Sequence, residues 1–132
     1  MIGIDTNILV RFLVVDDPAQ NEAAKAFLAE RSAENPAYIS SITLAETVWV
    51  LHRRLKYPLA AVISALRGLL ASEELIIEHA DELGQLLEGD RMPETDLADY
   101  LIAWAGMRAG CTHTVTFDQL AAKAVSSMEL LS

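Results

Sequence analysis

The sequence predicts an α/β fold: a three-layer α/β/α sandwich around a central, mainly parallel sheet of four to five strands. Three observations predict it. Short apolar runs alternate with longer helical ones, the strand candidates are apolar on both faces, and hairpin signals are few. Such strands are typical of a parallel sheet that helices cover on both faces. The 132-residue chain has no linker, low-complexity tract or internal repeat, so we expect one domain, residues 1–132.

The expected strands are short and lie between longer helical segments. They cover residues 1–5, 37–40, 74–78, 112–117 and 128–131. Apolar residues at helical spacing predict helices over residues 17–33, 41–55, 58–72, 80–89 and 95–110. In the first of these helices, Asp17 is the expected N-cap, Pro18 takes the first helical position and Gln20 completes a capping-box spacing. Gly110 is the expected residue just beyond the end of the last.

The composition excludes several classes of protein. With 52% hydrophobic residues the chain can build one core and is not of the disordered type. No apolar stretch reaches the roughly 18–20 residues of a spanning helix, so no membrane contact is expected. The N-terminus lacks the basic region of a signal peptide, and a single cysteine favours a cytoplasmic location. The formal net charge of −9 argues against a broad basic face for nucleic acid.

Two aspartates stand where a predicted strand meets a predicted helix. Asp5 lies in "MIGIDTNILV", between the strand residue Ile4 and a helix face that includes Leu9. Asp118 follows "TVTF" and precedes "QLAAKAV". Each is consistent with an N-cap, which stabilises a helix by about 1 kcal/mol. Each is equally consistent with a ligand site, because such sites form beyond the carboxyl ends of parallel strands.

Glu46 is harder to explain as a surface residue. On the predicted helix 41–55 it lies away from the main apolar stripe, with Ile42, Trp49 and Val50 as its neighbours one turn away. The nearest cation along the helix, Arg53, is two turns further on. This setting favours a functional carboxylate over an ordinary solvated one.

The segment "TDLADYLIAWAG" supplies two more acids, Asp96 and Asp99, on one helix face. Thr95 is the expected N-cap, which places Asp96 in the first turn, where the helix dipole favours an acid. Asp99 lies a turn further in, among alanine and isoleucine, and has a weaker structural reason to be acidic.

Four acids on four separate segments can meet at the carboxyl edge of one parallel sheet. They are Asp5, Glu46, Asp99 and Asp118. Carboxylate oxygens suit Mg²⁺ or Mn²⁺ better than zinc. Without a cation such a cluster repels itself, and a bound metal ion removes the conflict.

The order "IDTNIL", "SITLAETVWVL", "DLADYLIAWA", "TVTFD" strongly resembles the PIN-domain ribonucleases, and most of all the small VapC-like toxins of type II toxin–antitoxin pairs. The resemblance runs over essentially the whole chain. It implies a PIN-like fold and a Mg²⁺- or Mn²⁺-dependent endoribonuclease that hydrolyses RNA phosphodiester bonds. It also implies that the catalytic, metal-binding quartet is Asp5, Glu46, Asp99 and Asp118. The implied supporting residues are Thr6, Asn7, Asp96 and Thr116.

The same resemblance implies three partners: an RNA substrate, a small antitoxin protein and a second copy of the chain. Arg53, Arg54 and Lys56 are candidates for phosphate contacts, or they form a solvated helix end. The helical segments in residues 17–70 carry an apolar excess, with Phe27, Trp49, Val50 and Tyr57 among it. This excess holds an amphipathic antitoxin segment, or it is ordinary core.

Two alternative functions remain open. A non-catalytic interaction module with the same fold would lose one or more of the four acids, and all four are present. A phosphatase of the haloacid-dehalogenase type needs a second acid two residues after the first, where this chain has Asn7. Nucleotide-binding glycine motifs are missing from the sequence, and Cys111 with His113 does not make a zinc site.

Overall fold

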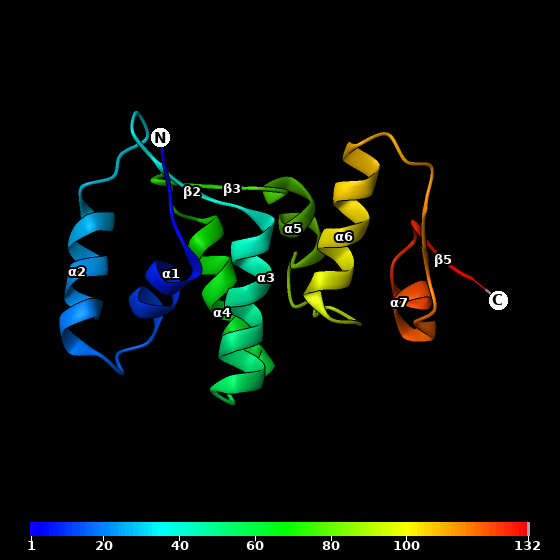
Figure 1. The fold of residues 1–132 in the computed structure, drawn as a ribbon, viewed down its shortest axis with the longest axis horizontal. Coiled ribbons are helices and arrows are strands. Elements are labelled where there is room, and N and C mark those ends of the chain that lie inside the picture. The colour runs from blue at the N-terminus through cyan, green and yellow to red at the C-terminus, as the bar shows by residue number, and fades with distance from the viewer. Residues whose placement is uncertain (132) are drawn as a thin grey trace. The chain divides into compact units, whose positions relative to one another are not determined.

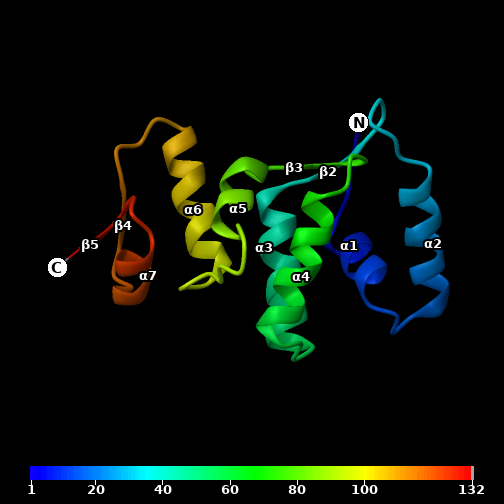
Figure 2. The same ribbon diagram turned by 180° about the vertical axis from the view of Figure 1, so that it is seen from behind.

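The computed structural model describes residues 1–131, which form two compact units, one up to Ala80 and one from Asp81 onward. Helices alternate with strands along the chain (Figures 1 and 2). Within residues 1–131 every strand pairing is parallel. The predicted α/β class with parallel strands is therefore confirmed, and each unit is described by itself below.

The first unit is built on a three-stranded parallel sheet in the order β1-β2-β3. Its elements are β1 (Ile2–Gly3), α1 (Thr6–Leu13), α2 (Pro18–Ala29), β2 (Ala37–Ile39), α3 (Ser41–Trp49), the π-helical turn η1 (Val50–Arg54), α4 (Leu59–Leu70) and β3 (Leu75–Ile77). In the register, Ala37 of β2 pairs with Ile2 on one side and Leu75 on the other. Helix α1 packs against both α2 and α3.

Caps and a small core fix these helices. As predicted, Asp17 caps α2 by accepting a hydrogen bond from the Gln20 N–H, with Pro18 in the first turn. The buried Asn21 side chain donates to the carbonyl of Arg11 at 2.8 Å, so α2 satisfies the last turn of α1. A core cluster joins α1, η1 and α4 through the buried residues Val14, Leu51 and Val62.

The predicted continuous helix over residues 41–55 is wrong in its second half. The α-helix stops at Trp49, and a π-helical turn follows, in which the Leu55 N–H donates to the carbonyl of Val50. The fully buried Thr47 donates its hydroxyl to the Thr43 carbonyl at 2.7 Å, one turn back. Such side-chain bonds to the preceding turn bend helices, and π-turns are frequent at functional sites.

The second unit contains a two-stranded parallel sheet of β4 and β5. Its elements are α5 (Ala80–Leu86), which begins at the boundary, α6 (Leu97–Arg108), β4 (Thr114–Thr116), α7 (Gln119–Ala124) and β5 (Met128–Leu130). A buried cluster joins α6 to α7 and β5 through Tyr100, Ala103, Ala121, Val125 and Met128. Helix α6 approaches β4 so closely at Gly106 that a Cβ there would lie 2.9 Å from Thr114 Oγ1.

The five predicted strands are all present within residues 1–131, but they are distributed over one sheet of three and one of two. Because the strands form two separate sheets, the single central sheet, its two helical layers and the single domain remain predictions. No helix within residues 1–131 is long and apolar enough to cross a membrane.

Candidate active site

Asp5 and Glu46 come together in the first unit through Thr6. Asp5 is the N-cap of α1, and its Oδ1 accepts a hydrogen bond from the Thr6 N–H at 2.6 Å. The Thr6 hydroxyl donates to Glu46 Oε1 at 3.0 Å, although the two residues are forty positions apart in the sequence. Thr6 itself is only 9% exposed. One buried threonine thus holds both carboxylates in place.

The start of α3 is fixed from three sides, which determines where Glu46 lies. Ser40 caps the helix by accepting from the Thr43 N–H at 3.2 Å. Glu78, just after β3, accepts from the Ser41 N–H at 2.7 Å. The Thr43 hydroxyl donates to the carbonyl of Ile4 at 3.4 Å, which ties α3 to the residue before Asp5. The ends of β1, β2 and β3 therefore converge on the helix that carries Glu46.

Asp5, Thr6 and Glu46 line a cavity of about 460 Å³. Its lining comprises Asp5, Thr6, Asn7, Glu46, Trp49, Val50 and Arg54. The volume lies in the range of about 300–1,000 Å³ that small-ligand sites occupy. All seven residues belong to the first unit. Of the predicted site residues, two acids, two supporting residues and one cation are thus gathered in one place.

Arg54 is the member of the predicted basic group that lines this cavity, and it also lines a smaller one beside it with Asn7 and Arg11. Arg54 is exposed and forms no ion pair with any other residue in the range 1–131. Its charge is therefore available to an anion. Arg53 belongs to the same π-turn and Lys56 follows it in a left-handed conformation (φ 63°), but neither lines the cavity.

In the second unit, Asp118 is the N-cap of α7, and its Oδ1 accepts from the Ala121 N–H at 3.0 Å. The Asp118 N–H donates to Thr116 Oγ1 at 3.0 Å, so Thr116 shapes the turn that presents the acid. Asp5 and Asp118 are both N-caps, and this alone does not distinguish a cap from a metal ligand.

The start of α6 differs from the prediction. Asp96, rather than Thr95, is the N-cap residue, and its side chain makes no capping hydrogen bond. Asp99 lies in the first turn, where Asp96 was expected. The Thr95 hydroxyl donates to Asp99 Oδ2 at 2.6 Å. Thr95 thus holds a carboxylate instead of a backbone N–H, and this leaves Asp99 with a defined orientation.

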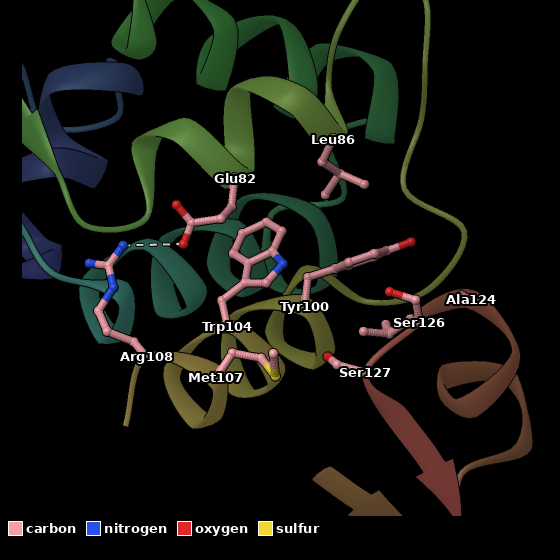
Figure 3. Close-up of a pocket in the computed structure, with 10 residues that line it drawn as sticks. Glu82, Leu86, Tyr100, Trp104, Met107, Arg108, Ala124, Ser126 and Ser127 are labelled. Carbon is pink, nitrogen blue, oxygen red and sulfur yellow. Dashed lines mark hydrogen bonds and ion pairs between the residues drawn. The ribbon is translucent and has the colours of Figure 1, made fainter. Parts of the chain in front are cut away.

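A second cavity of about 600 Å³ lies within the second unit (Figure 3). The rings of Tyr100 and Trp104 form part of its wall, with centroids 5.9 Å apart. Glu82 also lines it, and this carboxylate pairs with Arg108 at 3.2 Å. None of the four predicted acids borders this cavity. An acid already paired with arginine is a poor metal ligand, so this cavity is a poor candidate for a metal site.

The cavity of the first unit has donors that suit a hard divalent cation. It offers two carboxylates, a hydroxyl and an amide, all oxygen ligands, and no histidine or cysteine. Mg²⁺ is commonly held by one or two protein carboxylates, with waters and substrate phosphates completing its shell. Within residues 1–131 no group of three or more acids, histidines or cysteines forms a metal cluster. Asp5 and Glu46 therefore meet only the minimum requirement for Mg²⁺.

Ligand sites of parallel α/β folds lie beyond the carboxyl ends of the strands, and carboxylates at such a place can hold a catalytic divalent ion. Comparison with known families is more specific: the family described as PIN domain matches residues 2–125, and the chain belongs to it. Its members are generally nucleases that use divalent metal ions. Among curated proteins, none matches the chain.

Trp49 borders the acid-bearing cavity, which the sequence alone does not predict. Its indole is 59% exposed, and it lines the cavity together with Asp5 and Glu46. The sequence signal was the three-residue spacing from Glu46, which puts both side chains on one face of α3. That spacing was assigned to the surroundings of Glu46 and to an antitoxin surface, because the position of Asp5 relative to Trp49 is set by tertiary packing.

Proposed function

We propose that this chain is a Mg²⁺- or Mn²⁺-dependent endoribonuclease in which Asp5, Glu46, Asp99 and Asp118 serve one active site. The observation that carries the proposal is the Thr6 bridge, which holds Asp5 and Glu46 around one cavity. Asp99 and Asp118 complete the proposed quartet, as the resemblance of their segments to the PIN-domain ribonucleases implies.

We assign the following roles to the side chains of the proposed site. A divalent ion bound here would polarise a phosphate and supply a metal-activated water. Asp5 and Glu46 would hold that ion from the first unit, with Thr6 fixing the Glu46 carboxylate in one orientation. Asp99, itself oriented by Thr95, would hold the ion or accept a proton from the attacking water. Asp118 and Thr116 would complete the site, with Asp96 in a lesser role.

An acidic protein can act on RNA because the charge that matters is local. The chain has 10 basic and 19 acidic residues. A bound divalent ion reverses the sign of the potential at the carboxylates. Arg54 adds a positive charge on the wall of the same cavity. The bound ion and Arg54 would together attract a phosphate, although the net charge of the chain repels it.

The response of thermal stability to Mg²⁺ separates the nuclease from a non-catalytic module. If the acids bind Mg²⁺, the ion at about 100 times its Kd adds about 2.7 kcal/mol to the free energy of unfolding. The melting temperature then rises by several degrees. Ca²⁺-free buffer with and without Mg²⁺, at matched ionic strength, gives the comparison. An unchanged melting temperature would favour a module that retains the fold without the metal site.

The toxin role is part of the proposal, and it predicts a small antitoxin that binds the chain. An apolar groove of about 670 Å³ in the first unit fits one apolar face of an amphipathic helix. Its apolar wall includes Phe12, Leu13, Leu28, Ala65, Leu69 and Leu75. The residues expected to form the apolar excess, Phe27, Trp49, Val50 and Tyr57, do not line this groove. The ring of Phe27 packs instead under Arg31, with its centroid 4.6 Å from the guanidinium carbon.

Co-expression with a small protein encoded next to the chain tests the toxin role. We expect the two to elute as one complex, with the chain also forming a homodimer in the cytoplasm. Separate elution would remove the support for a toxin–antitoxin pair and would leave the nuclease proposal intact.

A further inference from the structure

Trp49 is exposed in a position where an exposed tryptophan needs an explanation. Its indole is 59% exposed on the face of α3 that also carries Glu46. Exposed aromatic rings next to charged groups mark binding surfaces, because each ring offers apolar contact at small cost in conformational entropy. Trp104, the other tryptophan, is half-buried and packs against Tyr100 in the second unit (Figure 3).

The neighbours of Trp49 indicate what it binds. The cavity that it lines also contains the two carboxylates of the proposed metal site and Arg54, which has no acidic partner within residues 1–131. A nucleotide offers the matching chemistry: a flat base for the indole, and a phosphate for the metal ion and the guanidinium. An aliphatic peptide segment would leave the charge of Arg54 unmatched.

The charge balance of the chain strengthens this interpretation. Most nucleic-acid-binding proteins obtain their affinity from many phosphate contacts by lysine and arginine. This chain has only 10 such residues against 19 acids. Stacking of a base on an aromatic ring does not depend on the net charge of the protein, and it tolerates every base because each has a flat face. It supplies affinity that a basic face does not supply here.

We propose that Trp49 is a stacking platform for an unpaired base of the RNA, beside Asp5 and Glu46, while Arg54 contacts an adjoining phosphate. Such a platform needs an unpaired base, since a base inside a duplex has both of its faces covered by its neighbours. This inference rests on the proposed nuclease function. It assigns a binding residue that takes no part in the chemistry.

The test measures RNA binding without cleavage, in chelator, with a short unstructured RNA oligonucleotide and the duplex that it forms with its complement. In a Trp104→Phe background, Trp49 is the only indole, so quenching of its fluorescence reports stacking. We expect the single strand to quench it and the duplex to leave it largely unchanged. The binding of Trp49→Ala is followed by a label on the RNA, because this variant has lost the reporting indole. Its Kd for the single strand should rise about 10-fold, which corresponds to about 1.4 kcal/mol.

Ile42→Ala is the matched control. Ile42 is 72% exposed on the same helix face, seven residues before Trp49, but it does not line the cavity. It should bind RNA like the parent protein. Wild-type affinity in Trp49→Ala, with an unchanged melting temperature, would overturn the inference and leave Trp49 as a contact for a protein partner. Equal quenching by the duplex would also overturn it.

The two proposals fail separately. RNA that quenches Trp49 and is not hydrolysed in Mn²⁺ contradicts the nuclease proposal alone. RNA that is hydrolysed by Trp49→Ala with wild-type affinity contradicts the stacking inference alone.

Discussion

RNA cleavage by this chain is expected to stop in excess chelator and to return when Mg²⁺ or Mn²⁺ is added back. The reason is the donor set. The acid-bearing cavity offers carboxylate, hydroxyl and amide oxygens. It contains no histidine that could act as a general base and activate the 2′-hydroxyl of the RNA without a metal ion. Zn²⁺ should restore cleavage poorly, because it prefers nitrogen and sulfur ligands.

The same assay with a modified RNA substrate identifies the nucleophile. Attack by a metal-activated water leaves the 2′-hydroxyl of the RNA uninvolved, so an RNA with 2′-O-methyl groups should still be cleaved. Undiminished cleavage in chelator, combined with loss of cleavage after 2′-O-methylation, would contradict the metal mechanism. It would indicate attack by the 2′-hydroxyl of the RNA itself.

Asp5→Asn is expected to abolish metal-dependent cleavage while leaving the fold intact. Asparagine caps helices about as well as aspartate, so α1 keeps its N-cap and the bond from the Thr6 N–H. Removing one of two like charges on the same cavity should leave the metal-free protein at least as stable as wild type. The cleavage rate should fall at least about 100-fold, because even residues that only support metal ligands cost about 10–100-fold.

Asp17→Asn is the matched control for this change. Asp17 is also an N-cap, and its side chain accepts from the Gln20 N–H, but it does not line the acid-bearing cavity. Thermal melts with and without Mg²⁺ and a cleavage assay should show no effect of Asp17→Asn. An Asp5→Asn protein that cleaves RNA like wild type would mean that Asp5 is a helix cap and nothing more.

Much of the secondary structure could be predicted because it is encoded locally. Asp17 and Pro18 start α2 as expected, since cap chemistry acts over three or four residues. The five strands follow short apolar runs. Two local predictions failed at threonines whose hydroxyls form other hydrogen bonds. Thr47 donates to the Thr43 carbonyl just before the π-turn, and Thr95 donates to the Asp99 carboxylate instead of capping α6.

The candidate site was predictable as a set of residues but not as a geometry. Asp5 stands out because it lies where a predicted strand meets a helix, and Glu46 because its helix neighbours are apolar and no cation lies one turn away. The Thr6 hydroxyl that joins them, and the presence of Trp49 and Arg54 on the same cavity, depend on how α1 and α3 pack. Contacts across forty residues leave no periodic trace in one sequence. For the same reason, the meeting of Asp99 and Asp118 with Asp5 remains a prediction.

We propose that Asp5 and Asp99 bind the same metal ion, and a Mn²⁺ titration of four proteins tests this proposal most directly. The proteins are wild type, Asp5→Asn, Asp99→Asn and Asp96→Asn. In the Asp99→Asn protein the side-chain amide oxygen can still accept the Thr95 hydroxyl, so the fold around α6 should survive. We expect Asp5→Asn and Asp99→Asn each to weaken Mn²⁺ binding at least about 10-fold, and Asp96→Asn to change it little. Wild-type Mn²⁺ affinity in Asp99→Asn would contradict the proposal, because Asp99 would then not be a ligand of the metal ion.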